Sequence, residues 1–204
     1  MSILIAIEGI DGSGGSTHCK LLTEWLKKEL NSKEKIFLTR EPSDLPIGNL
    51  MRVYLKKTCH PAVDALLFAA DRADHYFTEI KPAIDAKKIV ISDRNKLSSY
   101  VYQSSQGIDE KWIQRINNAV PDPDLNIILD IDPETSLKRK NLQFTSDNDK
   151  FETVEMLSKV REKYVYFASR YSNVVVISSK GTLEETQEEI RTVVKNFLKK
   201  KGFL

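Results

Sequence analysis

Five short runs of β-branched and other apolar residues alternate with longer stretches of helical periodicity along this chain of 204 residues. Each run is largely apolar from end to end, as the strands of a parallel sheet are when helices cover both faces. The runs predict strands at 3–8, 35–39, 88–92, 125–130 and 173–178. Such alternation is typical of βαβ units, so we expect an α/β protein built on a five-stranded parallel sheet.

The segments between the runs carry the spacing of amphipathic helices. They predict helices at 17–30, 61–80, 96–106, 110–118, 133–140, 153–170 and 183–199. One stretch, NLQFTSDNDK at 141–150, is polar and aperiodic, which favours an exposed, movable segment between two helices. No repeat or low-complexity linker interrupts the pattern, and the length suits one domain spanning 1–204.

The charge of the chain is nearly balanced, because 31 basic and 29 acidic residues give a formal net charge of +2. This balance does not favour nucleic acid as a partner. Cys19 and Cys59 lack the spacing of a metal site or a disulfide framework, and reduced thiols fit a cytoplasmic location. No segment has the pattern of a signal peptide or a membrane span, so we expect a cytoplasmic protein with no membrane partner.

The stretch EGIDGSGGST at 8–17 resembles a phosphate-binding loop that lacks one part. In the pattern G-x-x-x-x-G-K-[ST], Gly9, Gly14 and Ser16 take their places, but Gly15 stands where the lysine belongs. The context is right, since a predicted strand precedes the glycines and a predicted helix follows them. Glycines let successive backbone N–H groups point at one anion, and the helix N-terminus adds partial positive charge. The sequence therefore predicts a phosphate site even without the lysine.

Two residues beside this loop are candidate ligands of a metal ion. The hydroxyl of Ser16 holds the position that binds Mg²⁺ in P-loop proteins, and the second group should be an acid at the end of a neighbouring strand. Asp93 follows the apolar run at 88–92, at the strand edge where ligands of open α/β sheets gather. The alternative is that the glycines form a tight turn and Asp93 caps a helix.

Motifs along nearly the whole chain resemble those of the thymidylate kinases. They are EGIDGSG at 8–14, LTREP at 38–42, PIG at 46–48, LLFAADRADH at 66–75, SDR at 92–94, YQ at 102–103, LDIDPE at 129–134 and DKFE at 149–152. The resemblance implies a P-loop NTPase three-layer sandwich with a short lid at about 138–152. It also implies transfer of the γ-phosphoryl group of ATP to dTMP with Mg²⁺, by a homodimer.

The same resemblance implies a role for individual residues. For ATP these are Gly9, Gly12, Ser13, Gly14, Gly15, Ser16 and Thr17, and for the metal Ser16 and Asp93. For the nucleoside monophosphate they are Glu8, Arg40, Arg52, Phe68, Arg72, Arg94, Ser99, Tyr102 and Gln103. Asp11, Arg94 and Arg139 are the implied catalytic residues, with Arg139 as the lid arginine that neutralises the transferring phosphoryl group. Lys138, Lys140 and Lys150 are further cations of the lid region.

Physical reasons accompany several of these roles. Phe68 can stack on a pyrimidine ring, and Arg72, one helical turn later, can reach a base carbonyl. Guanidinium groups at 40, 52 and 94 suit the oxygens of an acceptor phosphate. For Phe68 a place in the core remains open, for Tyr102 a role in helix packing, and for Arg139 a solvated place in a charge run.

Two departures from the family pattern set the open questions. Gly15 replaces the lysine, and Asn95 replaces the aromatic or histidine ring that follows Asp-Arg in the family. Loss of one preorganised donor typically costs about 2.7 to 4 kcal/mol, or about 10² to 10³ in rate. Three functions stay open: a weakened dTMP kinase, a kinase for another pyrimidine monophosphate such as UMP or dUMP, and a nucleotide-binding relative without catalysis.

Overall fold

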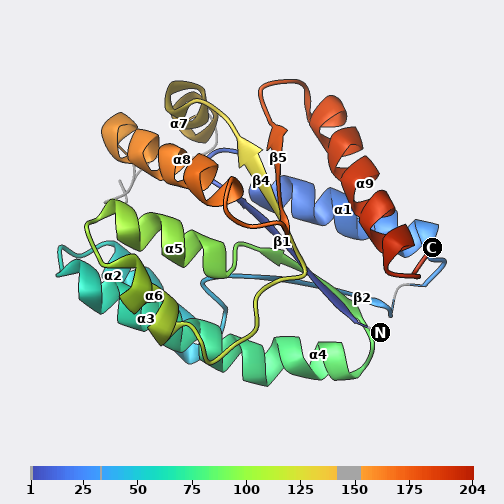
Figure 1. The fold of residues 1–204 in the computed structure, drawn as a ribbon, viewed down its shortest axis with the longest axis horizontal. Helices are drawn as coiled ribbons and strands as arrows, with labels where there is room; N and C mark the ends of the chain where they lie inside the picture. Colours follow the sequence, from blue (N-terminus) through green and yellow to red (C-terminus); the bar gives the residue numbers. More distant parts are fainter. Residues whose placement is uncertain (1, 33, 142–152) are drawn as a thin grey trace.

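One parallel sheet forms the centre of the computed structural model, which describes residues 2–32, 34–141 and 153–204. Within these ranges the sheet has five strands in the order β2-β3-β1-β4-β5. The strands are β1 (Ile3–Gly9), β2 (Ile36–Arg40), β3 (Ile89–Asp93), β4 (Leu125–Asp130) and β5 (Val174–Ser178). Helices cover both faces of the sheet (Figure 1). The predicted three-layer α/β fold is therefore confirmed.

Strands β1 and β3 lie side by side, yet their connections leave in opposite directions, because β1 leads to β2 and β3 leads to β4. Ligands of open α/β sheets bind at the carboxyl ends of such a pair. The register pairs Asp93 of β3 with Ile7 of β1 on one side and with Arg40 of β2 on the other. The topology thus brings the glycine-rich turn after β1, Asp93 and Arg40 to one edge.

The two faces of the sheet bury different helices. On one face, Ile3, Ile5 and Ile7 of β1 pack with α1 (Gly15–Glu29) and α9 (Leu183–Lys200). The helical residues of this core are Leu22, Leu26, Ile190, Val194 and Leu198. Since side chains alternate along a strand, Leu4 of β1 points to the other face, where it packs with Ile80. This alternation fixes α1, and with it the phosphate loop, against the sheet.

The second face carries the helices that surround the end of the cavity opposite the glycine-rich turn. They are α3 (Pro61–His75), α5 (Lys96–Ser105), α6 (Glu110–Ile116) and α8 (Val154–Ala168). Val101 of α5 and Val160 of α8 are fully buried in one core with Ile128 of β4. Helix α5 packs against both α3 and α8. A helix that follows directly from Asp93 is thereby held between two others.

The predicted helix at 61–80 differs from the observed one. Helix α3 ends at His75, a π-helical turn spans Tyr76–Ile80, and α4 (Lys81–Asp85) continues the same segment. Pro82 lacks the N–H that an α-helix needs at this position, which accounts for a change of hydrogen-bond register in the turn before it. The segment therefore extends five residues beyond the predicted end, through Asp85.

Helix α2 (Pro46–Leu55) was not predicted, because the motif PIG at 46–48 read as part of a loop. Pro46 is the first helical residue, where its missing N–H costs nothing. Gly48 is required by close contact, since a Cβ there would lie 2.2 Å from the carbonyl oxygen of Ser43. Pro46 and Gly48, which suggested a loop, thus mark the start of a helix and its close packing against Ser43.

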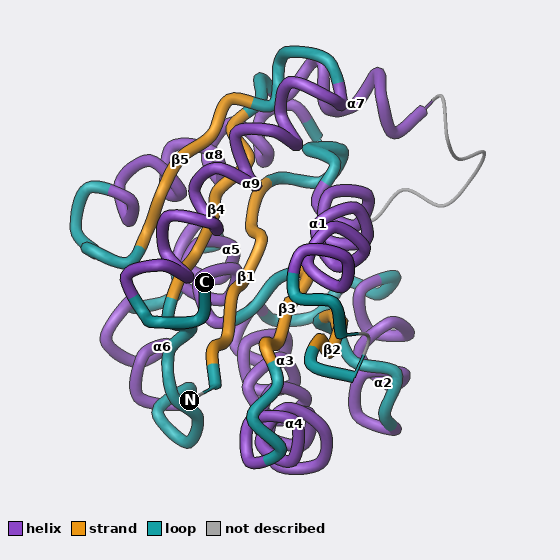
Figure 2. Tube along the Cα trace, turned by 90° about the vertical axis from the view of Figure 1, so that its right-hand side faces the viewer, coloured by secondary structure: helices purple, strands orange, loops and turns teal. Residues whose placement is uncertain are grey.

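Helix α7 (Pro133–Asn141) lies beyond the carboxyl end of β4, next to the start of α1 (Figure 2). Residues 138–141 of the expected lid belong to this helix. The remainder of the expected lid, 142–152, with Lys150 and the DKFE motif, lies outside the described residues. None of the helices in the described ranges combines the length and apolarity needed to cross a membrane.

Candidate active site

The glycine-rich turn between β1 and α1 is a phosphate-binding loop in its backbone conformation. Gly9, Gly12 and Gly14 have φ angles of +152°, +82° and +96°, in the region that favours glycine. Helix α1 then begins at Gly15, so its free N–H groups face the cavity. The hydroxyl of Ser13 is buried below the turn. The loop thereby presents backbone donors and a helix N-terminus to one anion-sized space.

Helix α7 packs against this loop at Gly12. A Cβ at residue 12 would lie 2.3 Å from the carbonyl oxygen of Ser136 in α7. The Ser136 hydroxyl also donates a hydrogen bond to the carbonyl oxygen of Asp11. Helix α7 is therefore in direct contact with the loop, and only glycine permits that contact.

The Asp93 carboxylate, at the end of β3, contacts the start of α1. The hydroxyl of Ser16 donates a hydrogen bond to Oδ2 of Asp93 at 2.5 Å. A Cβ on Gly15 would lie 3.0 Å from the other carboxylate oxygen, Oδ1. Ser16 and Asp93 are therefore brought together, and the space beside Gly15 is bordered by an acid rather than by a cation.

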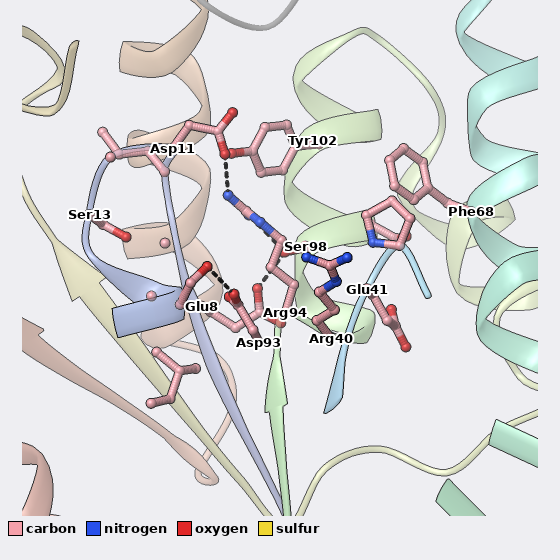
Figure 3. A pocket seen from close by; sticks show the side chains of 18 of the residues that line it. Glu8, Asp11, Ser13, Arg40, Glu41, Phe68, Asp93, Arg94, Ser98 and Tyr102 are labelled. Atoms are coloured by element: carbon pink, nitrogen blue, oxygen red, sulfur yellow. Dashed lines mark hydrogen bonds and ion pairs between the residues drawn. The ribbon is translucent and has the colours of Figure 1, made fainter. Parts of the chain in front are cut away.

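Arg94, the next residue, crosses the floor of the cavity. Its backbone has φ +69°, its N–H donates to Ile7 O at 2.9 Å, and its carbonyl oxygen accepts a bond from the Ser92 hydroxyl at 2.6 Å. The guanidinium donates to Asp11 Oδ1 at 2.5 Å and lies 5.2 Å from the ring centroid of Tyr102. Figure 3 shows this group between the two sides of the cavity. An unusual backbone conformation is thus held by two strands so that one cation faces the cavity.

Glu8 lies beneath Arg94 and is 1% exposed. Burial raises its pKa from 4.5 to about 7, although hydrogen bonds from Ser98, Asn95 and Tyr164 and the charge of Arg94 oppose the rise. The hydroxyl of Ser98 donates to Glu8 Oε2 at 2.5 Å, and the Tyr164 hydroxyl of α8 donates to the same oxygen at 3.1 Å. Glu8 thus joins β1, α5 and α8 directly below the cavity.

The wall farthest from the glycines contains a buried ion pair. Arg72 is 2% exposed and donates to Glu41 Oε2 from Nε at 2.9 Å and from Nη2 at 2.7 Å. It also donates to Ser99 Oγ at 2.9 Å, to Asn117 Oδ1 and to Asn95 O. Burial, the largest single effect, would raise the pKa of Glu41, but the charges and hydrogen bonds of Arg72 and His75 together outweigh it and hold that pKa below its usual value. Glu41 belongs to the motif LTREP, but its pairing with Arg72 was not predicted from the sequence.

Four more residues that the sequence motifs implied for the nucleoside monophosphate line the same cavity. Phe68 is half-buried on α3, and Ser99, Tyr102 and Gln103 are buried on α5. Gln103 is 1% exposed, and neither its amide nitrogen nor its amide oxygen has a hydrogen-bond partner among the described residues. A buried amide without partners costs free energy, so a ligand that pairs with it is favoured.

Arg40 and Arg52 are held at the loop that follows β2. Arg40 is exposed and pairs with Asp44 at 2.6 Å. Arg52, from α2, donates to the carbonyl oxygens of Ser43 at 2.6 Å and Pro42 at 2.7 Å. Both arginines line the cavity, and Arg52 also fixes the loop that carries Glu41.

The structure places Arg139 away from this space. Its Nη1 donates to the carbonyl oxygen of Ser179, after β5, at 2.9 Å. Of the described α7 residues, Lys140 lines the cavity and Arg139 does not. The Lys140 ammonium lies 3.9 Å from Asp11 Oδ2. In the described part of α7 the cation that lines the cavity is therefore Lys140, the residue after the implied Arg139.

Together these groups enclose a cavity of about 450 Å³. The P-loop and Asp93 form one end, and Phe68, Arg72 and Gln103 form the other, with Arg94 between them. In Figure 3 the labelled side chains come from the ends of β1, β2 and β3 and from α3 and α5. The fold and the glycine-rich turn are those of a P-loop nucleotide-binding protein, the class that includes the phosphoryl-transferring kinases.

Comparisons with known proteins narrow this class. The family model described as "Thymidylate kinase" matches residues 7–190. A probable thymidylate kinase from Sulfolobus acidocaldarius is 41% identical, with 96% of this chain and 97% of the relative covered. One from Pyrobaculum aerophilum is 40% identical with the same two coverages. The chain therefore belongs to the thymidylate kinase family, a family of nucleoside monophosphate kinases.

A solved structure agrees with this assignment. The crystal structure of thymidylate kinase from Ehrlichia chaffeensis matches with a TM-score of 0.77 and 31% sequence identity, covering 95% of this chain and 98% of that one. The resemblance that the sequence motifs indicated is thus confirmed at the level of family and fold.

Proposed function

We propose that this chain transfers the γ-phosphoryl group of ATP to dTMP, which yields ADP and dTDP. The observation that carries the proposal is one cavity in which a phosphate-binding loop and a wall of the size of a nucleoside face each other across Arg94. Phosphoryl transfer needs the two phosphates positioned in line and their charge neutralised, and such a cavity supplies both.

At the donor end, the ATP phosphates bind to the loop. The residues proposed for ATP are Gly9, Gly12, Ser13, Gly14, Gly15, Ser16 and Thr17. Backbone N–H groups supply most of the contacts here, because the side chains in this stretch are small. The positive φ angles at Gly9, Gly12 and Gly14 support this role, since they turn the backbone around one anion.

The oxygens of Ser16 and Asp93 are proposed to hold Mg²⁺. Mg²⁺ prefers hard oxygen ligands and usually takes only one or two from the protein, with waters and substrate phosphates completing its shell. Among the described residues no group of three or more His, Cys, Asp or Glu side chains is arranged to hold a metal, which fits an ion brought in with ATP. Bound there, Mg²⁺ would neutralise charge on the phosphate oxygens.

At the acceptor end, the proposal assigns dTMP to the wall. Phe68 stacks on the base, and the Gln103 amide with the Ser99 hydroxyl pairs with the base edge. Arg72 holds this wall through Glu41 and Ser99. Tyr102 and Asp11 face the sugar, and Glu8 fixes Ser98 beneath it. Arg40, Arg52 and Arg94 attract the acceptor phosphate.

The test is an acceptor panel read by ADP release with ATP and Mg²⁺. We expect the largest kcat/KM with dTMP, a smaller one with dUMP, and the smallest with UMP, because Tyr102 limits room for a 2′-hydroxyl. Turnover with UMP equal to that with dTMP would reassign the acceptor. Absence of ADP with every pyrimidine monophosphate, together with tight ATP binding in calorimetry, would contradict the kinase.

The proposal includes a homodimer in the cytoplasm. Helices α2 and α3 pack together and expose Leu50, Val53, Val63 and Leu66 to 46%, 49%, 38% and 50%. A face of this kind on two adjacent helices suits contact with a second copy. Light scattering should give a dimer for the wild type and a monomer for Leu66→Glu. Val165→Glu on α8, where Val165 is 53% exposed, is the matched control and should leave the dimer intact.

A further inference from the structure

The P-loop of this chain carries no lysine or arginine, yet a triphosphate brings about four negative charges to it. Amide dipoles and one divalent ion leave part of that charge without a partner. The cavity-lining cations in the described part of the chain are Arg40, Arg52, Arg72, Arg94 and Lys140. The question is which of these can serve the donor phosphates.

Four of the five belong to the acceptor side or the middle of the cavity. Arg72 donates five hydrogen bonds to described neighbours and is buried with Glu41. Arg40 and Arg52 are tied to the loop after β2 through Asp44 and backbone carbonyls. Arg94 lies in the middle, with its guanidinium 5.2 Å from the ring centroid of Tyr102. The remaining cation, Lys140, comes from the helix that touches the P-loop itself.

Helix α7 is fixed on the P-loop at Ser136. The backbone of Ser136 leaves no room for a Cβ at residue 12, and its hydroxyl donates to Asp11 O. Lys140 follows Ser136 by four residues, so both lie on the same face of the helix. The contact at Ser136 therefore places Lys140 beside the P-loop.

The position of the ammonium agrees with this geometry. Lys140 Nζ lies 3.9 Å from Oδ2 of Asp11, a residue of the P-loop, and the side chain is 26% exposed. The aliphatic stem of a lysine is flexible and its charge is compact, so the ammonium can move by several ångströms without moving the helix. Arg139, one residue earlier, points away and bonds to Ser179 O.

We propose that Lys140 supplies to the donor triphosphate the positive charge that Gly15 does not, and that it reaches the P-loop from α7 instead of α1. This inference rests on the proposed function, since it names a catalytic residue for the same reaction. It requires that the importance of Lys140 depend on the residue at position 15. A lysine at either position then serves the same phosphate oxygens.

The experiment is a double-mutant cycle of the wild type, Lys140→Met, Gly15→Lys and the double variant. We expect Lys140→Met to lower kcat about 100-fold, the effect of losing one preorganised donor, and to weaken ATP binding about tenfold in calorimetry without dTMP. In the Gly15→Lys background the same substitution should lower kcat less than tenfold. Equal losses in both backgrounds would overturn the proposal, because independent groups act additively.

Lys138→Met is the matched control, since Lys138 lies on the same helix with the same charge but is exposed to solvent. It should leave kcat and ATP affinity within twofold of the wild type. Lys140→Arg should recover most of the ATP affinity. If Lys140→Met and Lys138→Met have equal effects on ATP binding, Lys140 has no special role, whatever the behaviour of the Gly15→Lys proteins.

The two readouts separate this inference from the proposed function. ATP affinity is measured without an acceptor, so it tests Lys140 even if the wild type phosphorylates no monophosphate. Turnover by the wild type with unchanged ATP affinity and kcat in Lys140→Met would refute the role of Lys140 and leave the kinase intact. A wild type that binds no ATP would refute both. Melting temperatures of all variants show that each protein is folded.

Discussion

The two ends of the cavity are built in opposite ways. The donor end consists of backbone N–H groups and small side chains, and Ser16 there is exposed. The acceptor wall consists of a buried charge pair, Glu41 and Arg72, whose partners are completed by Ser99, Asn95 and Asn117. One end therefore gains its charge balance only with a ligand, while the other is balanced within the protein.

Because of this difference, we expect substitutions at one end to lower stability and substitutions at the other end to lower turnover. A group in the acceptor wall is needed by the fold itself, because an uncompensated buried charge is costly. A group at the donor end faces solvent until ATP arrives, so its loss should change turnover and leave the fold nearly as stable. Four substitutions test this division, beginning with the one that should change the protein most.

Arg72→Met should have the largest effect, on stability. It leaves the Glu41 carboxylate buried without its main partner, which typically costs about 3 to 5 kcal/mol in the free energy of unfolding. Urea unfolding measures this loss. Lys81→Met, which breaks the exposed pair with Asp85, is the control and should leave the free energy of unfolding nearly unchanged. Similar losses in the two variants would show that the wall is not a balanced buried pair.

Asp93→Asn should have the next largest effect, on turnover. It removes the charge beside Ser16, and we expect kcat to fall by about 10² to 10³, or about 2.7 to 4 kcal/mol in the barrier. The free energy of unfolding should change by less than about 1 kcal/mol, because the carboxylate is partly exposed. A large loss of stability with little change in kcat would reverse the division between the two ends.

The raised pKa of Glu8 predicts that the stability of the protein depends on pH. Its pKa is about 7 in the folded protein and about 4.5 when exposed, so between these values the folded state holds a proton that the unfolded state has lost. Stability from this group is therefore present below about pH 4.5 and is lost as the pH rises to about 7, by about 3 kcal/mol in total. The difference in unfolding free energy between the wild type and Glu8→Gln, measured from pH 4 to 8, isolates it. A flat difference would contradict the raised pKa.

Gly15→Lys should have the smallest effect, a gain. A lysine restores the missing cation, and we expect kcat to rise about tenfold, or about 1.4 kcal/mol in the barrier, because Lys140 already serves part of that role. The new Cβ would require Asp93 Oδ1, 3.0 Å away, to shift by a few tenths of an ångström. Gly15→Ala carries the same steric change without charge and is the control. If it matches Gly15→Lys, the gain does not come from the cation.

The sequence permitted the fold and the donor end to be predicted because their signals are local. Each strand is one apolar run, and the P-loop is one stretch of ten residues ending at a predicted helix. Asp93 was placed correctly at its sheet edge because carboxyl ends of parallel strands meet there. These signals need no knowledge of how distant segments pack.

The partners of Arg72 in the wall, and the α7 cation that lines the cavity, could not be predicted because their positions depend on contacts between distant segments. Arg72 meets Glu41 and Asn117 across 31 and 45 residues, and no local pattern reports such a contact. In the run Lys138, Arg139 and Lys140, each residue is rotated about 100° from the last around the helix, so composition alone cannot tell which one faces the cavity. The contact at Ser136, which decides this, appears only in the fold.

The absence of a side chain at residue 12 has a mechanical consequence. Since the loop and α7 touch there without any intervening atoms, we expect a change in the shape of the loop to move the helix. A dye attached at the exposed position 138 would therefore sense nucleotide arriving at the loop without contacting it. A bulkier residue at position 12 would separate the loop from α7, and the dye would then no longer respond to nucleotide.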